Sequence, residues 1–581
     1  DEARAELRSL AGALSREYPE TNTNISVGVD NFSNHLFGNV RRSLFVLFGA
    51  VGLVLLIACV TVANLQIARS GVRWREMAIR NALGATRSRI IRLLLIESMT
   101  LAFAGGILGA FIAFIACRTF VGLSPSEVLQ LREINFDWTV AFFTLGVVLV
   151  TGFLFGIIPA LRLSRAQPAG ALRERASSSA FGSNKRSTQS ALIISQIAIT
   201  LALLVGAGLL INGIWRMKRV NVGVETSNVL TANLALPKTY NPQSVAAFYK
   251  NLQQQLQTIP KVRSASAVIP QPFSGGALHT DFKIEGYVFG QSSQPNADLI
   301  LVQPGYFKTM GVVLLDGRDF GEQDDDSAPP ATIINHALAV RYFNGESPIG
   351  RHIEVESLDG IAPSSHQDKQ LTVVGVVGDI RQSGVKSDVR PEIYVPLQQR
   401  PFAEIVAVLK TDGPSNPVVN SVRATVLKLD RNLPIYNVST MDAGLDSTFA
   451  QDRFNLILLS MFAGVALFLT LVGLHGVMAQ FVVQRRKEIA IRMAIGASRL
   501  KVLKLIVGQG MILVITGLIL GVLFALALTS FMKTMLFEVS ATDPLTFVII
   551  TVLMATMALV ACSMPAKTAS EVDPMNVLRA E

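Results

Sequence analysis

Two segments of the chain place a glutamate four residues before an arginine. The first, Arg75 to Arg87, reads R-E-M-A-I-R-N-A-L-G-A-T-R, and the second, Lys487 to Arg499, reads K-E-I-A-I-R-M-A-I-G-A-S-R. The two glutamates, Glu76 and Glu488, lie 412 residues apart, which indicates an internal duplication. This spacing places both charges on one helical face. We interpret the two segments as docking surfaces and not as active sites.

No catalytic constellation is found among the other residues that could carry chemistry. The histidines between residues 215 and 452 are scattered, without the H-E-x-x-H spacing or the cysteines of a zinc site. The acidic run from 322 to 326 lacks the register of an EF-hand, so we interpret it as a solvated loop. His475 lies inside an apolar stretch, where helix packing is favoured over a proton relay. We predict no catalytic, metal or cofactor site.

The elements that must position the repeated segments are membrane helices. Of 581 residues, 50% are hydrophobic and 16% are charged, and the mean hydropathy is +0.43. A hydrocarbon core of about 30 Å takes about 20 helical residues to cross, whereas helices buried in a soluble core are shorter. Runs of this length predict seven spans, at 43 to 67, 93 to 117, 138 to 161, 190 to 214, 455 to 480, 505 to 531 and 543 to 563.

The net charge of +10 is concentrated beside these spans, which argues against a nucleic-acid partner. Short loops rich in Arg and Lys face the cytoplasm, so both repeated segments are expected there. Residues 215 to 452 then lie outside the cytoplasm as one large domain. The positive-inside rule, by which Arg and Lys collect in cytoplasmic loops, applies to short loops and not to a domain of this length. An alternative left open is that these cations fix topology and touch lipid headgroups. The lipid bilayer is in either case a predicted partner.

The predicted fold class is an α-helical polytopic membrane protein, in two repeated bundles, with an α+β periplasmic domain. Strand patterns are expected at 229 to 236, 298 to 302, 331 to 334, 371 to 377, 392 to 395 and 405 to 410, and helices at 242 to 259, 336 to 342 and 415 to 428. The predicted domains are a tail of a first outer domain (1–42), a first membrane domain (43–174, with segment 68–91), a cytoplasmic linker (175–189), a span (190–214), the outer domain (215–452) and a second membrane domain (453–581, with segment 481–504).

A G-x-x-x-G motif occurs at matching positions of the two halves. Gly105 and Gly109 form the first motif, and Gly517 and Gly521 form the second. Small residues at this spacing let helix backbones approach closely. We therefore predict a helix-packing role for all four glycines.

The chain lacks the G-x-x-x-x-G-K-[ST] signature of a P-loop ATPase, so ATP energy would have to come from a partner.

With its repeated segments and flanking spans, the sequence resembles a duplicated FtsX/MacB-type ABC transporter permease. The outer domain adds phrases that resemble the MacB-type periplasmic core domain. These are P-G-Y-F-K-T-M-G-V-V-L-L-D-G-R-D-F (Pro304 to Phe320), I-I-N-H-A-L-A-V-R-Y-F (Ile333 to Phe343), P-I-G-R-H-I (Pro348 to Ile353) and V-V-G-V-V-G-D-I-R (Val373 to Arg381).

The resemblance implies a non-catalytic subunit of the bacterial inner membrane, which passes the motion of a separate cytoplasmic ABC ATPase dimer to the periplasmic domain. Efflux of a drug, peptide or lipid-like substrate is the favoured role, and an FtsX-like signalling scaffold is the rival. A periplasmic adaptor or a cell-wall hydrolase would be a further partner. A permease half of this type has four spans, so we expect an N-terminal truncation. The residues expected to dock the ATPase are Arg75, Glu76, Arg80, Gly84, Arg87, Lys487, Glu488, Arg492, Gly496 and Arg499.

Overall fold

The computed structural model describes residues 2–18, 32–83, 86–123, 137–163, 182–237, 239–287, 295–355, 370–531, 540 and 542–570. The chain divides into two compact units. One unit comprises Asn39–Gly213 with Asn455–Glu581, and the other comprises Asp1–Gly38 with Ile214–Phe454. The first unit is helical, and the second contains all the strands found in the described part of the chain.

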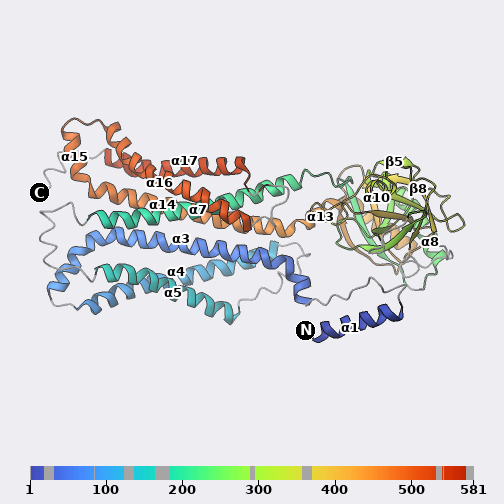
Figure 1. Ribbon diagram of the computed structural model, residues 1–581, viewed down its shortest axis with the longest axis horizontal. Coiled ribbons are helices and arrows are strands. Elements are labelled where there is room, and N and C mark those ends of the chain that lie inside the picture. The colour runs from blue at the N-terminus through green and yellow to red at the C-terminus, as the bar shows by residue number, and fades with distance from the viewer. Residues whose placement is uncertain are drawn as a thin grey trace. The chain divides into compact units, whose positions relative to one another are not determined.

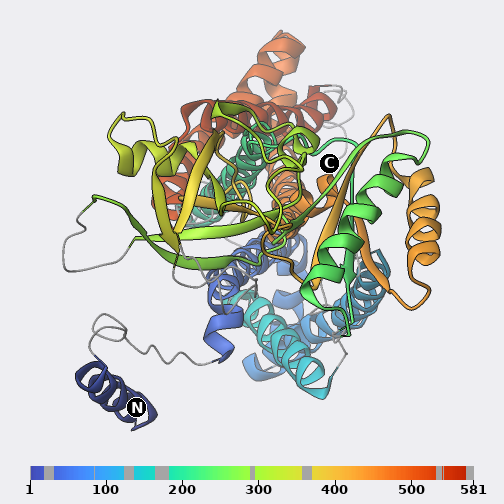
Figure 2. The same ribbon diagram turned by 90° about the vertical axis from the view of Figure 1, so that its right-hand side faces the viewer.

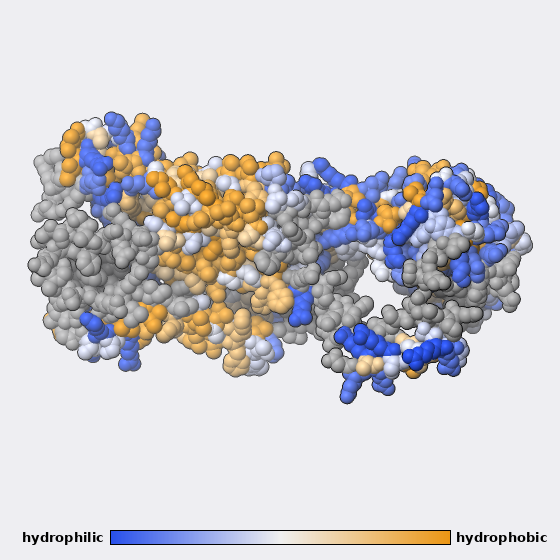
Figure 3. All heavy atoms as spheres, in the orientation of Figure 1, coloured by the Kyte–Doolittle hydropathy of each residue, from blue (hydrophilic) through white to orange (hydrophobic). Residues whose placement is uncertain are grey.

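Long apolar helices run side by side in the helical unit (Figure 1), and a broad hydrophobic surface covers them (Figure 3). Among the described residues, six helices are long and apolar enough to cross a membrane. The remaining expected span, 138–161, coincides with α5, where the described apolar stretch Trp138–Phe153 is shorter. The helices are α3 (Phe32–Ala82), α4 (Arg87–Leu123), α5 (Trp138–Leu163), α7 (Gly182–Met217), α14 (Ala450–Gln484), α15 (Arg486–Ala494), α16 (Arg499–Phe531) and α17 (Pro544–Ser570).

Helix α7 is the most enclosed of these spans, with 67% of its apolar window buried, compared with 0% for α4. A Cβ added to Gly521 of α16 would lie 3.0 Å from the Cα of Ala198 in α7. Two side-chain hydrogen bonds also join α7 to neighbouring helices. The hydroxyls of Thr200 in α7 and Thr470 in α14 lie 2.7 Å apart, and Gln196 of α7 donates to Thr61 of α3 at 2.9 Å.

The predicted α+β domain is built on a frame of two split β-α-β units. The strands pair in the order β11-β1-β10-β2, so each helix connects two strands that flank a third. Helices α8 and α12 lie side by side in Figure 2 and contact each other. The frame comprises β1 (Val229–Ala235), α8 (Pro242–Gln257), β2 (Val262–Ile269), β10 (Glu404–Thr411), a short 3-10 turn (Asn416–Val418), α12 (Val419–Leu429) and β11 (Ile435–Thr440).

The sequence of α8 accounts for both its start and its orientation. The side chain of Asn241 accepts a hydrogen bond from the backbone N–H of Ser244, and Pro242 occupies the first turn, where its missing N–H costs nothing. Four apolar side chains at helical spacing then bury one face. They are Val245, Tyr249, Leu252 and Leu256.

A ring of strands is inserted between β2 and β10. Its strands pair in the order β4-β3-β7-β8-β6-β9, and parallel pairing of β4 with β9 closes the ring. Closure leaves few free strand edges. The inserted elements are β3 (Leu278–Ile284), β4 (Asn296–Val302), α9 (Tyr306–Met310), β5 (Leu314–Gly317), β6 (Ala331–Asn335), α10 (His336–Phe343), β7 (His352–Val355), β8 (Gln370–Val377) and β9 (Glu392–Pro396). Two further helices of this unit, α1 (Glu2–Glu17) and α13 (Met441–Thr448), belong to neither the frame nor the insert.

The predicted fold class is confirmed, and each strand and helix expected in the outer domain is present. Strands β2, β3, β5 and β7 and helices α9 and α13 were not predicted. The interpretation of the acidic run as a solvated loop is wrong for Asp324, whose side chain is 4% exposed. Both oxygens of Asp324 accept hydrogen bonds from the guanidinium of Arg318 at 2.7 Å, so this carboxylate fixes the loop from within.

A carboxyl group is buried at the start of β9. Glu392 is 1% exposed, and the hydroxyl of Tyr394 donates to its Oε2 at 2.5 Å. Burial raises the pKa of Glu392 well above its ordinary value, because the charged form would lose its hydration. The carboxyl therefore keeps its proton to a higher pH than an exposed glutamate does.

The repeat supplies a matched test of helix packing. Gly521→Val should lower the melting temperature of the purified chain in detergent, because the added side chain would collide with the backbone of α7. Overpacking of this kind typically costs about 1–3 kcal/mol. Gly109→Val, at the equivalent position of the first half, should have little effect, because a Cβ there meets no described atom within 4 Å. Equal shifts for the two variants would contradict the packing of α16 on α7.

The buried carboxyl predicts a pH dependence of stability. A carboxyl whose pKa is higher in the folded state stabilises the fold at low pH, and this contribution is lost as the pH rises through the folded-state value. Glu392→Gln should therefore stabilise the core domain more at pH 8 than at pH 5, relative to the unmodified chain. Pulse proteolysis of the full chain measures this difference. The exposed Glu285→Gln is the control, and a pH-independent effect of Glu392→Gln would refute the assignment.

Candidate docking surface of the repeated segments

In the second half, the repeated segment forms the short helix α15 between α14 and α16. Helix α14 ends at Gln484, and α15 begins one residue after Arg485. Ile489 and Ala490 are 7% and 2% exposed, and Ile489 belongs to the buried cluster of the bundle. The inward face of α15 is thus packed on the membrane helices, whereas Glu488, Ile491 and Arg492 are exposed.

The outward face carries the glutamate and the arginine of the repeat, which form an ion pair. Arg492 contacts the Oε1 of Glu488 at 2.7 Å, and Arg485 lies 3.7 Å from the other oxygen. The Arg485 guanidinium also sits 4.5 Å from the ring centre of Phe481. The side chains of Glu488 and Arg492 are 44% and 50% exposed, so the pair contributes little to stability. Its structural effect is to hold two opposite charges in a fixed pattern.

Gly496 ends α15 in the left-handed conformation. Its φ is +100°, its N–H donates to the carbonyl of Met493 at 3.0 Å, and the next N–H, of Ala497, donates to Arg492 at 2.9 Å. These two hydrogen bonds form a Schellman motif, which glycine completes at the least steric cost. The predicted site glycine is therefore the residue that turns the chain sharply from α15 towards α16.

An exposed apolar residue stands directly before this turn, and sequence analysis missed it. Ile495 is 81% exposed, and its counterpart in the first half, Leu83, is 82% exposed. The two lie 412 residues apart, as do the paired glutamates. The signal available in the sequence was a bulky apolar residue immediately before each repeated glycine. We call Leu83 and Ile495 the apolar tips.

The first copy is described in less detail than the second. Helix α3 continues to Ala82, and Arg80 and Arg87 are exposed on either side of the turn. Arg499 is likewise exposed at the start of α16. Gly84 and the side chains of Arg75, Glu76 and Lys487 lie outside the described residues, so the placement of the Glu76 and Arg80 charges on one helical face stays a prediction.

The other residues singled out in the sequence lie along the spans. A Cβ on Gly517 would meet Ile197 of α7 at 2.8 Å, and Gly521 contacts α7 as described above. Gly105 and Gly109 are exposed, and the packing role predicted for them stays a prediction. His475 is exposed on α14. Among the described residues, no group of three or more His, Cys, Asp or Glu side chains could hold a metal ion.

Comparison with known families accounts for most of the chain. Residues 190–425 match the MacB-like periplasmic core domain. Residues 47–168 and 460–574 each match the FtsX-like permease C-terminal family. Each FtsX-like match contains one of the repeated segments, so the duplication seen in the sequence is a duplication of this permease domain.

Relatives with curated descriptions are export proteins. The pyoverdine export ATP-binding/permease protein PvdT of Pseudomonas aeruginosa is 22% identical over 406 residues, which cover 67% of this chain and 55% of the relative. The macrolide export ATP-binding/permease protein MacB of Mannheimia succiniciproducens is 23% identical, covering 56% of this chain and 50% of the relative. The chain thus spans about half the length of the curated relatives it matches.

Among solved structures, the periplasmic region of MacB from Actinobacillus actinomycetemcomitans is 14% identical. The alignment covers 40% of this chain and 98% of that structure, with a TM-score of 0.27.

The left-handed cap predicts a specific loss at one glycine. Gly496→Ala should destabilise the α15 turn by about 1–2 kcal/mol, because a Cβ disfavours the left-handed conformation. Cleavage at residues 485–499 by a protease added to the purified chain in detergent should therefore accelerate. Gly508→Ala is a matched control, since that glycine has no positive φ and no atom within 4 Å of an added Cβ. Unchanged cleavage of Gly496→Ala would contradict the role of the cap.

Proposed function

The chain belongs to the family of ABC-type transporter permeases with FtsX-like domains and a MacB-like periplasmic core domain, and we propose from this premise that it couples a separate ATPase to export. It acts as the non-catalytic membrane subunit. A cytoplasmic nucleotide-binding dimer docks on the repeated segments, and its ATP-driven motion passes to the extracytoplasmic domain. The protein works in the bacterial inner membrane, with the core domain in the periplasm.

The observation that carries this proposal is the recurrence of the apolar tips. Single exposed apolar residues are common on protein surfaces and need no explanation. Here two bulky ones occupy equivalent positions of a duplicated domain, each more than 80% exposed. In the second half, the tip directly precedes the Gly496 cap and follows the Glu488–Arg492 pair by one turn. An apolar anchor beside fixed charges is the composition that protein interfaces favour.

The second repeated segment is also attached so that it can transmit force. Its inward face is held by Ile489, and the helix α14 that precedes it is unbroken over 35 residues. At about 1.5 Å per residue, this helix is about 52 Å long. At its other end, Asp452 in the first turn of α14 contacts Lys386 of the core domain at 2.6 Å. A rigid helix tied at both ends suits the transfer of motion from the cytoplasm to the core domain.

The relatives support export as the direction of transport, because their printed names describe exporters. We propose a drug, peptide or lipid-like cargo and a periplasmic adaptor as a second partner.

Substitution of the tips should abolish docking. Ile495→Asp with Leu83→Asp should reduce the affinity of the chain for its ATPase at least tenfold, because each change places a charge where an apolar contact is needed. Affinity is measured by titrating the purified ATPase against the permease in nanodiscs. Val340→Asp is the control, since this residue of the core domain is also apolar and 60% exposed.

Glu488→Arg tests the charged part of the same surface and should weaken binding in a salt-dependent manner. Wild-type affinity in both the tip variant and Glu488→Arg would exclude the repeated segments as the docking surface. Export by cells carrying the tip variant should fall together with ATPase binding. Export that persists without ATPase binding would reject the coupling role.

A further inference from the structure

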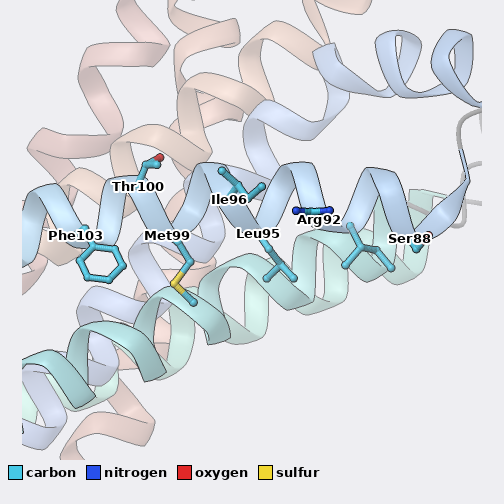
Figure 4. A pocket seen from close by; sticks show the side chains of 8 residues that line it. Ser88, Arg92, Leu95, Ile96, Met99, Thr100 and Phe103 are labelled. Carbon is cyan, nitrogen blue, oxygen red and sulfur yellow. The ribbon is translucent and has the colours of Figure 1, made fainter.

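One face of α4 has a groove where this helix packs against α5 (Figure 4). The groove has a volume of about 500 Å³, and Leu95 and Met99 are among the residues that line it. A Cβ added to Gly156 of α5 would lie 2.8 Å from Leu95, and one added to Gly152 would lie 3.0 Å from Met99. These side chains therefore already have protein partners. The core domain, in contrast, contains buried polar atoms that no described residue pairs.

Three side chains of the core domain bury four polar atoms that lack a hydrogen-bond partner among the described residues. These atoms are the hydroxyl of Tyr306, Oε1 of Glu392 and both amide atoms of Gln382. The side chains of Tyr306 and Glu392 are 0% and 1% exposed. Buried polar groups of folded proteins are nearly always hydrogen-bonded, either to protein or to ordered water. The four atoms therefore indicate a partner that the chain itself does not supply.

The same three side chains come from separate segments and lie close together. The hydroxyl of Tyr394 donates to Oε2 of Glu392 at 2.5 Å. The ring centres of Tyr306 and Tyr394 lie 5.5 and 5.0 Å from that of Phe307, which packs between them. Burial raises the pKa of Tyr306, and the nearby Glu392 raises it further. Burial also raises the pKa of Glu392, and the adjacent amide of Gln382 opposes this shift.

The site lies outside the core of the ring. Ile393 and Val395 of β9 belong to the large buried cluster of the domain. Glu392 and Tyr394 alternate with them along the strand, so they point to the opposite face. Phe307 of α9 covers that face, since its ring contacts Tyr394. The unpaired atoms are therefore enclosed between the ring and the elements that pack on its outside.

Gln382 brings a connecting segment to this site. It belongs to residues 378–387, which we call the strap. The backbone N–H of Arg381 donates to the carbonyl of Val222, in the segment that follows α7, at 3.1 Å. Lys386 contacts the first turn of α14 at 2.6 Å. The strap thus connects the ring to the chain next to two membrane helices, and Gln382 is its residue at the buried site.

Water matches the four atoms better than other small ligands. The hydroxyl of Tyr306 and the amide nitrogen of Gln382 can donate, and the amide oxygen of Gln382 can accept. In its protonated form, the carboxyl of Glu392 can do both. Water also donates and accepts, whereas a metal ion would leave the amide nitrogen without an acceptor. An apolar ligand would leave all four atoms unpaired.

We propose that an ordered internal water binds between Tyr306, Glu392 and Gln382 and joins the strap to β9 of the ring. Internal waters typically make about three hydrogen bonds to buried polar groups, which is the number of side chains available here. Because the three side chains share one water, the loss of any one of them weakens the hydrogen bonds of the other two.

The sign of one substitution tests the site. Tyr306→Phe removes only the hydroxyl, and it should raise the unfolding equilibrium constant of the core domain about fivefold, because a hydrogen bond to the water is lost. The constant is measured by pulse proteolysis of the full chain. Tyr249→Phe is the matched control, since this buried hydroxyl donates to the carbonyl of Ala403 at 2.9 Å, and it should show a similar rise. An unchanged or lower constant for Tyr306→Phe would overturn the proposal, because removing an unpaired hydroxyl does not destabilise.

A second substitution tests whether the water is shared. Gln382→Met keeps the length of the side chain without its amide and should also raise the constant about fivefold. The double variant of Tyr306→Phe and Gln382→Met should rise about fivefold too, because the first change already releases the water. Independent effects would multiply to about 25-fold and would refute a shared water.

A density map of the unmodified full chain, at a resolution that shows ordered water, keeps the test open even if Gln382→Met fails to fold. Density within hydrogen-bonding distance of all three side chains supports the proposal. A map without this density, or one in which Gln382 bonds directly to Glu392, would overturn it.

Discussion

The close packing of α7 is the interaction on which the membrane bundle depends. A lipid bilayer offers no hydrophobic drive between helices, so association must come from close packing and a few hydrogen bonds. Gly517 and Gly521 let α16 approach the backbone of α7, and the Thr200–Thr470 pair joins it to α14. Spans from both sequence halves thus meet on one helix, because Gln196 of α7 also donates to Thr61 of α3.

The same bundle holds the short helix α15, to which we assign the proposed docking role. Helix α15 rests on the bundle through Ile489, while its turn is fixed by the Gly496 cap. These two restraints limit bending of α15 and of the turn that follows it. In the proposed coupling, motion applied at the apolar tip would move the helices that flank α15, of which α14 extends to the contact between Asp452 and Lys386.

Sequence patterns predicted the parts of this protein that have a strong period or a repeat. The spans, the frame strands β1 and β10 and the amphipathic α8 are of this kind. Strand β2 was missed because its Ser and Ala residues give weak alternation. Strand β3 does alternate, with Thr280, Phe282 and Ile284 buried between more polar residues, so its signal was present in the sequence and was overlooked. The exposure of Ile495, the burial of Asp324 and the different surroundings of the two glycine motifs depend on tertiary contacts, which no local pattern encodes.

The position of the inserted ring has a consequence for how such proteins can diversify. Strands β2 and β10 are hydrogen-bonded neighbours, with Val268 opposite Val406, so the insert leaves and re-enters the frame at one end of adjacent strands. One buried cluster nevertheless runs through both parts, because Leu252 of α8 and Val422 of α12 belong to the same cluster as Phe282 and Ile334 of the ring. A change in the shape of the ring therefore also has to preserve the core that the ring shares with the frame.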